Sequence, residues 1–170
     1  MAEIPEDEEP EFDAALIGSV ARRASLRNIE LTGSILTVLD DEPLSETGKR
    51  DGIEEMPSIK ARGRWDVDRE RSLLGVTILF AITPLPDGEA FGAPYYIGAE
   101  FRATYVLSDH DDLTDEALGC FARWNGQFNA WPYMREYVQS TASRAQIGEI
   151  QVPLYRIPSP VPTSSVEPDT

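Results

Sequence analysis

The chain has 170 residues, a hydrophobic content of 41% and a formal net charge of -15. This length suits one globular domain with a buried core, and the negative charge argues against DNA or RNA as the main partner, because phosphate binding requires a basic surface. The single cysteine, Cys120, excludes an internal disulfide framework, and no apolar run is long enough to predict membrane insertion. We therefore expect a soluble cytoplasmic protein.

Both ends of the chain are predicted to be disordered. Residues 1–11 are rich in acidic residues and contain two prolines, and residues 158–170 are rich in proline and serine. Such compositions cannot bury enough apolar surface to offset the entropy lost on ordering. The folded domain is therefore expected to span residues 12–157.

The first elements in chain order are a short helix and a strand. Asp13 is a suitable N-cap for a helix with an apolar stripe from Leu16 to Ala24. Between residues 27 and 39, β-branched residues are frequent and Ile29, Leu31 and Ile35 alternate with polar residues, which predicts a strand. The following loop, up to residue 57, is long for a compact domain and is expected to be functional or mobile.

Three further strands are predicted before a long helix. In residues 58–71, apolar side chains alternate with charged ones, so one face of this strand is expected to be charged. Residues 72–84 are apolar on both faces and should form the most buried strand, and residues 95–107 alternate again. The run of strands followed by a helix predicts an α+β fold, with a four-stranded antiparallel sheet packed on a long kinked helix.

The long helix has a well-marked start and a proline in its interior. Thr114 is a suitable N-cap, and an apolar face continues through Trp124 and Phe128 to Pro132 and beyond it toward Gly148. An interior proline removes a backbone hydrogen bond and clashes with the preceding turn, so we expect a kink at Pro132.

The sequence contains no recognisable catalytic motif. There is no nucleophile elbow, Walker loop, dinucleotide glycine pattern or cysteine pair. The cluster "SDHDD" around His110 lies in one turn before a helix, where acidic groups favour solubility and the helix dipole, and Cys120 falls near an apolar helix face. We therefore expect no enzyme, metal ion or cofactor.

Two segments resemble the SecB export chaperone family. The stretch "WPYMREYVQSTASRAQIGEIQVPL" is similar to the helix and exit loop of that family, and "RWDVD" at residues 64–68 is similar to a strand of it. The resemblance spans roughly residues 25–157. The matching positions of the first stretch are Trp131, Pro132, Tyr133, Arg135, Glu136, Ser143, Arg144 and Pro153.

This resemblance implies a chaperone that holds unfolded chains in long apolar grooves. It places Trp65 and Val67 at positions associated with client binding, and we add Met56 and Ile59 as groove-lining residues. An alternating apolar strand face is more often core than groove, so a groove requires that this face be partly open to water. An acidic surface would also steer basic clients toward the protein.

The resemblance also implies a homo-oligomer, a dimer of dimers paired through the long helix. A bend at Pro132 would let Trp124 and Phe128 meet a partner subunit while Trp131 and Met134 stay against the sheet. Arg135 and Glu136 are expected to form a structural hydrogen-bonding pair.

Two departures from the family pattern bear on function. SecB proteins continue into a lid-like helix after the proline exit, whereas this chain runs into Pro, Ser and Thr residues. The acidic positions through which the family docks the motor ATPase SecA correspond to Asn28 and Thr32, around Ile29, which argues against motor docking. The pattern is closer to SecB-like chaperones that guard the antitoxin of a toxin–antitoxin pair.

Two other functional classes stay open. One is a small α+β ligand-binding or isomerase-like enzyme with an apolar pocket, which would need a buried acid or base. Asp66 and Asp68 lie beside arginines on the charged strand face, which argues against this class. The other is a purely structural oligomerisation module.

Overall fold

The computed structural model describes residues 2–3, 12–38, 57–84 and 95–156. The elements in chain order are β1 (Ala2–Glu3), α1 (Ala14–Ala21), β2 (Ala24–Val38), β3 (Ser58–Asp68), β4 (Leu73–Thr83), β5 (Tyr95–Leu107), α2 (Asp115–Phe121), the π-helical segment η1 (Ala122–Gly126) and α3 (Gln127–Ala145). The α+β class is confirmed, with four long antiparallel strands and a long joined helix.

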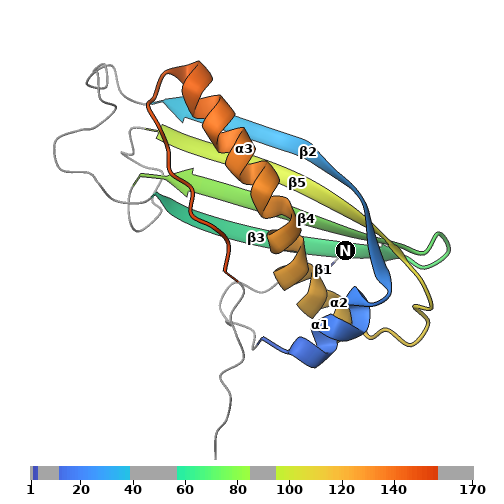
Figure 1. The fold of residues 1–170 in the computed structure, drawn as a ribbon. Coiled ribbons are helices and arrows are strands. Elements are labelled where there is room, and N and C mark those ends of the chain that lie inside the picture. Colours follow the sequence, from blue (N-terminus) through green and yellow to red (C-terminus); the bar gives the residue numbers. More distant parts are fainter. Residues whose placement is uncertain (1, 4–11, 39–56, 85–94, 157–170) are drawn as a thin grey trace, which may run out of the picture.

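The strands form one antiparallel sheet in the order β1-β3-β4-β5-β2. Strands β3, β4 and β5 follow one another as a meander, whereas β2 crosses over to pair with β5 at the far edge. Figure 1 shows α1, α2 and α3 on one face of this sheet, with α3 lying obliquely across the strands. We call this side the helix face and the opposite side the open face.

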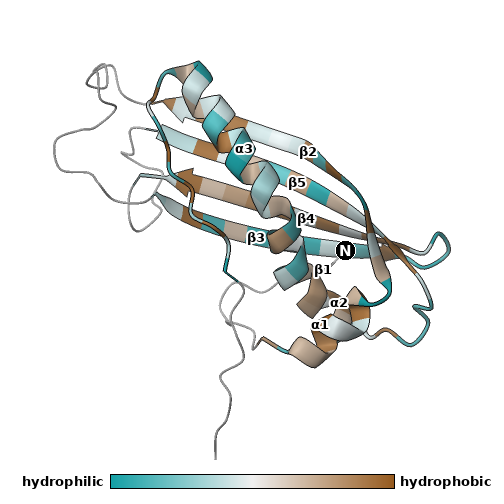
Figure 2. Ribbon diagram, in the orientation of Figure 1, coloured by the Kyte–Doolittle hydropathy of each residue, from teal (hydrophilic) through white to brown (hydrophobic). Residues whose placement is uncertain are grey.

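The alternation of side chains in β3, β4 and β5 assigns each residue to one of these faces, because paired residues point the same way. On β4, Leu74, Val76, Ile78, Phe80 and Ile82 are fully buried on the helix face, which confirms that this is the most buried strand. Hydrophobic and hydrophilic residues accordingly alternate along the strands in Figure 2. The predicted charged face of β3 is the open face, since Arg64 pairs with Thr77 and Trp65 with Val76.

Strand β2 departs from simple alternation. Its register with β5 shifts between Leu26 and Asn28 and again between Leu31 and Gly33. A bulge adds one residue and reverses the side-chain direction beyond it. Leu31 therefore pairs with Phe101 on the helix face, whereas Ile35 pairs with Gly98 on the open face. The prediction that Leu31 and Ile35 share a face was wrong for this reason.

The two predicted helix starts are confirmed. The Asp13 carboxylate accepts hydrogen bonds from the N–H groups of Ala15 and Leu16, and the Thr114 hydroxyl accepts from Ala117 N–H. Both caps satisfy N–H groups that a helix leaves without intrahelical partners.

The long helix is irregular upstream of its proline. Pro132 lies inside α3, and the change from α to π geometry falls at Ala122–Gly126. At Gly126 the helix approaches the sheet so closely that a Cβ atom would lie 2.5 Å from Val76 Cγ1. The glycine therefore permits the close packing of η1 on β4.

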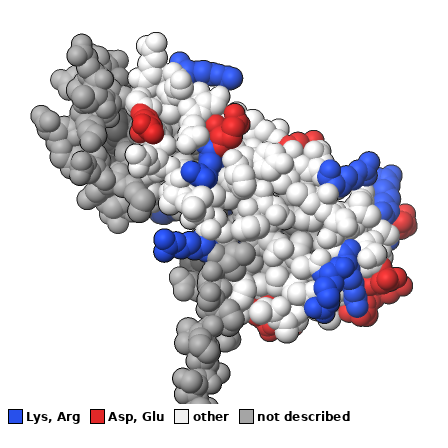
Figure 3. Space-filling model, in the orientation of Figure 1, with Lys and Arg blue, Asp and Glu red and all other residues white. Residues whose placement is uncertain are grey.

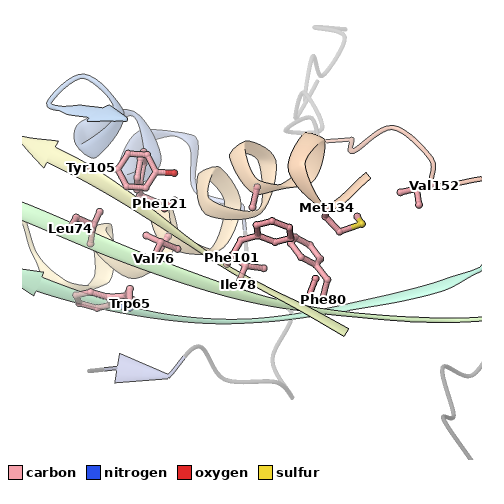
Figure 4. Packing of buried hydrophobic residues seen from close by; sticks show 14 of the residues in the cluster. Trp65, Leu74, Val76, Ile78, Phe80, Phe101, Tyr105, Phe121, Met134 and Val152 are labelled. Atoms are coloured by element: carbon pink, nitrogen blue, oxygen red, sulfur yellow. The ribbon is translucent and has the colours of Figure 1, made fainter. Parts of the chain in front are cut away.

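After α3 the chain turns at Gln146 and runs back beside the helix (Figure 1). Ile147, Ile150 and Val152 of this returning segment are buried in the common core. In Figure 4, Val152 lies beyond Met134, in line with the core side chains between sheet and helix.

Two residues of the N-terminal segment form strand β1, and the predicted disorder of residues 4–11 falls outside the described residues. Ala2 pairs with Trp65 and Glu3 with Arg64 along the outer edge of β3. Such pairing uses main-chain groups and needs no apolar side chains, so composition alone could not predict it. Most of the net negative charge belongs to residues that the structure does not describe, above all 4–11 and 39–56. Consistently, Figure 3 shows a mostly uncharged surface over the helix layer.

Candidate client-binding surface

Trp65, the principal candidate from the sequence, lies in the core. Its side chain is 8% exposed and points to the helix face of β3. The indole lies beside α2, where a Cβ at Gly119 would be 3.4 Å from Trp65 Nε1. Figure 4 shows it aligned with the other core side chains. In the described chain Trp65 therefore does not present the water-exposed surface that a groove residue requires.

The neighbours of Trp65 on the same face are more open. Ile59 and Val67 are half-buried at the two ends of β3, where they pair with Ile82 and Leu74. Met56 lies outside the described residues. Client binding at these positions stays a prediction, and Ile59 and Val67 are the positions where β3 offers apolar surface.

On the open face, β3 makes ion pairs with β5 across the intervening strand β4. The Arg102 guanidinium donates to the Asp66 carboxylate at 2.9 Å and to the Thr77 hydroxyl, and Arg64 donates to Glu100 at 3.1 Å. The Asp66 hydrogen bond raises the pKa of Arg102. Gly75 makes room for this pair, because a Cβ there would lie 2.1 Å from Arg102 Nη2.

The two predicted interface residues have different environments. Trp124 is half-buried and packs edge-on against Phe12, with ring centroids 5.5 Å apart. Its Nε1 atom is buried and has no hydrogen-bond partner among the described residues. Phe128 is 46% exposed and contacts Tyr155 of the returning segment. Phe128 thus remains available to a partner, whereas Trp124 is largely engaged within the chain.

The motif around Pro132 anchors the returning segment. Trp131 Nε1 donates to the Pro153 carbonyl at 2.8 Å, and its ring packs against Phe80 of β4 and against Tyr155. The contact between Trp131 and Pro153 explains why both belong to one sequence pattern. Met134 is fully buried, so the prediction that Trp131 and Met134 stay against the sheet is confirmed.

Of the remaining motif residues around Pro132, two are exposed to solvent and one has a buried nitrogen without a hydrogen-bond partner among the described residues. Tyr133 is 47% exposed, and Glu136 is exposed as well. Arg135 Nε is buried without a hydrogen-bond partner in the described part of the chain. The predicted bond between Arg135 and Glu136 stays a prediction.

A second apolar surface, missed from the sequence, lies along β2. Because β2 is an edge strand and α3 packs mainly on β5 and β4, the helix-face side chains of β2 are incompletely covered. We call these four residues the β2 apolar row; their exposed fractions run from 38% to 47%, and they are Leu26, Leu31, Leu36 and Val38. The signal in the sequence was the leucine content of this strand, but its bulges concealed the common face.

The histidine and the cysteine, which are potentially reactive side chains, lie in surroundings that do not favour catalysis. His110 Nε2 lies 3.0 Å from the Ser72 hydroxyl, next to an exposed Asp111. Burial raises the pKa of the Cys120 thiol, which disfavours the reactive thiolate. Among the described residues, no group of three or more His, Cys, Asp or Glu side chains could hold a metal ion, and no helix is long and apolar enough to span a membrane.

The arrangement of sheet and helices is similar to a solved chaperone. That solved structure shows the SecB-like chaperone Rv1957 of Mycobacterium tuberculosis in complex with a ChAD peptide from the Rv1956 HigA1 antitoxin. The two chains are 21% identical, with a TM-score of 0.67 over 83% of this chain and 97% of that one. The chain has the SecB-like fold. Within it, β3 is the strand that carries "RWDVD", and the long helix carries the Pro132 motif.

The other comparisons add no functional information beyond the SecB-like fold. A Streptococcus agalactiae protein of unknown function is 6% identical, with a TM-score of 0.40 over 78% of this chain and 97% of that one, which is too low to support an argument. No protein-family model and no curated protein matches the chain.

Proposed function

We propose that this protein is a holdase chaperone that binds non-native polypeptides in an extended form. The observation that carries the proposal is the SecB-like fold, shared with a chaperone that was solved with an antitoxin peptide. Exposed apolar side chains on the edge strand β2 and on α3 agree with such a role, because a holdase must offer apolar surface to unfolded chains.

The client surface is proposed to lie on β3. This strand is at the edge of the four long strands, so an extended client could add to it through main-chain hydrogen bonds. Ile59, Val67 and Met56 would contact apolar client side chains. Trp65 would support the strand from within the core, and would contact a client only if the strand moved away from α2.

The protein is further proposed to be a homo-oligomer, a dimer of dimers. The β2 apolar row and Phe128 supply exposed apolar surface on the helix side, which a second copy could cover. Phe128→Asp should weaken such an assembly, whereas Leu154→Asp, at a side chain that is 74% exposed on the returning segment, serves as a control.

The proposed clients are aggregation-prone chains, among them an antitoxin. The acidic segments outside the described ranges would attract basic clients. Docking of an export motor is not proposed, because Asn28 and Thr32 are uncharged and the Thr32 hydroxyl donates to the Glu100 carboxylate. A cytoplasmic location, with no nucleic acid and no cofactor, completes the proposal.

An enzyme is the less favoured alternative. Its general acid or base should be a buried carboxylate, but Asp66 is 39% exposed and paired with Arg102 on the open face. The geometry of β3 therefore favours a binding surface over a reaction centre.

Light scattering of a denatured client diluted into buffer tests the holdase proposal. The protein should suppress aggregation at roughly equimolar amounts without nucleotide. Val67→Asp and Ile59→Asp should each weaken this protection several-fold, and Leu154→Asp should retain it. Unchanged aggregation in the presence of the parent protein would refute the proposal.

A further inference from the structure

Two side-chain nitrogen atoms on the long helix are buried without a hydrogen-bond partner. They are Trp124 Nε1 and Arg135 Nε, and neither finds an acceptor in the described part of the chain. Such groups are rare in folded proteins, because a buried donor without an acceptor loses its hydrogen bonds to water and gains none in return. Two of them on one helix point to an acceptor that a single chain does not supply.

The outward side of α3 can be assigned from its buried side. The helix faces the sheet with buried residues spaced four apart, which are Ala130, Met134, Val138 and Ala142. Successive residues of an α-helix are rotated by about 100°, so a residue two positions away lies on the opposite side. We call this opposite side the outer row; its residues Phe128, Pro132 and Glu136 are all exposed.

Arg135 and Glu136 carry opposite charges in the middle of this helix but do not complete each other. Side chains of consecutive helix residues do not face one another, so the two cannot form a good pair within one helix. Glu136 takes part in none of the ion pairs among the described residues. The planar guanidinium of an arginine suits a carboxylate at an interface, where it can donate two parallel hydrogen bonds. A carboxylate for Arg135 must therefore come from outside its own helix.

A two-fold axis brings such neighbouring residues together. In an interface between two identical subunits, residue i of one copy contacts residue j of the other, and j contacts i. When two antiparallel copies of α3 meet with the axis between Arg135 and Glu136, each Arg135 lies level with the partner's Glu136. The two ion pairs then form together. In the same register Phe128, which is 46% exposed, lies level with the small side chain of the partner's Ser143.

We propose that α3 packs antiparallel on α3 of a second copy, and that Arg135 pairs with the partner's Glu136 across a two-fold axis. The proposal rests on the proposed homo-oligomer and names the residues that join its subunits. Two chains with a net charge of -15 repel each other, so they should meet where the surface carries few charges. The helix layer has such a surface, as Figure 3 shows.

Charge reversal in the full chain tests the contact. Arg135→Glu places two acidic side chains against two identical ones at the axis, and Glu136→Arg does the same with basic side chains. Each variant alone should associate about tenfold more weakly than the parent, because like charges across an interface repel. Glu70→Arg, at an exposed residue of the β3–β4 turn, changes the net charge as Glu136→Arg does and should assemble like the parent. Sedimentation equilibrium measures the association, and circular dichroism confirms that each variant is folded.

Mixing the two reversed variants provides the sharper test. An equimolar mixture of Arg135→Glu and Glu136→Arg sets the acidic pair of one chain against the basic pair of the other, so both ion pairs are restored. The mixture should form one-to-one assemblies with an affinity within about threefold of the parent. Net charge cannot produce this recovery, because both variants remain strongly negative.

Four outcomes would overturn the proposal. One is a mixture that associates no better than the single variants, and another is single variants that associate as tightly as the parent. A third is reversed variants that assemble normally but lose protection of a denatured client, which would assign the outer row to clients. A monomeric parent would refute the proposed homo-oligomer as well as this contact.

A neutral pair of substitutions covers the case in which Arg135→Glu does not fold. Arg135→Gln, Glu136→Gln and the double variant form a double-mutant cycle on the association constant. If the two residues pair across the interface, the double variant should lose no more affinity than the weaker of the two single variants. Additive losses would show that the two side chains do not interact and would overturn the proposal.

Discussion

The two edges of the sheet differ in how their apolar sides are covered. At the β3 edge, Trp65 is buried against α2, and β1 pairs with the outer backbone. At the β2 edge, Leu31 and Leu36 remain 46% and 38% exposed, although they point to the same helix face. The placement of the helices explains the contrast, since α3 and η1 pack over β4 and β5 rather than over β2.

This contrast separates two kinds of apolar strand face. The apolar side chains of β3 are mostly covered by helices of the same chain. The β3 edge therefore offers mainly backbone groups, together with the half-buried Ile59 and Val67. The apolar side chains of β2 remain partly exposed in a single chain, which is typical of a surface that another copy covers.

Trp65→Asp should unfold the protein. In place of a core indole, it would bury an unpaired carboxylate, at a cost of several kcal/mol, which is a large part of the stability of a domain of this size. Thermal unfolding followed by circular dichroism measures the effect. Leu36→Asp, at an exposed site on the same sheet face, should leave the unfolding temperature of a single chain nearly unchanged.

The outcome of Trp65→Asp also decides between core and groove. From the sequence, an open groove predicts a folded variant that has lost client protection, whereas the burial of Trp65 predicts loss of the fold. A folded Trp65→Asp variant would show that the β3 face opens in solution.

The double variant Leu31→Asp with Leu36→Asp should abolish assembly. Two charges in the β2 apolar row would repel a partner surface without disturbing the core of one chain. Sedimentation equilibrium at micromolar concentration should change from an oligomer to a monomer. Leu79→Asp, at an apolar residue of the open face that is 39% exposed, is the matched control. A monomeric parent protein would contradict the role of this row.

Gly126→Ala should destabilise the packing of η1 on β4, next to β3. The new Cβ would meet Val76 Cγ1 at 2.5 Å, and overpacking of a core costs about 1–3 kcal/mol. Gly33→Ala on β2 is the control, because its Cβ would be 3.7 Å from the Glu100 side chain, an ordinary contact. Denaturant unfolding of both variants compares the two sites, and equal losses would show that η1 can shift away from β4.

Asp66→Asn should have the smallest effect. The pair of Asp66 and Arg102 is partly exposed, with side chains 39% and 33% accessible, so its loss should cost about 1 kcal/mol or less. The cost should shrink in high salt, because mobile ions screen the pair. A loss of several kcal/mol would show that the open face is shielded from solvent.

The sequence was sufficient for the regular parts of the fold. The alternation in β3 and the apolar run of β4 predicted the correct faces, and the side chains of Asp13 and Thr114 identified both helix starts. These features depend on local chemistry and on side-chain period, which a single sequence displays directly.

The candidate surface was less predictable because it depends on long-range packing. Whether Trp65 is covered depends on the position of α2, and which β2 residues share a face depends on bulges fixed by pairing with β5. The pairing of Ala2 with Trp65 likewise involves backbone atoms, which carry no residue-specific signal.

Hydrogen exchange with and without a bound unfolded client tests whether clients add to the edge of β3. Amides of β3, residues 58–68, should become slower to exchange when the client binds, because the client hydrogen-bonds to that edge. Amides of β2, residues 24–38, should change little. Client-induced protection confined to β2, or binding without protection of either edge, would contradict a holdase that adds its clients to β3.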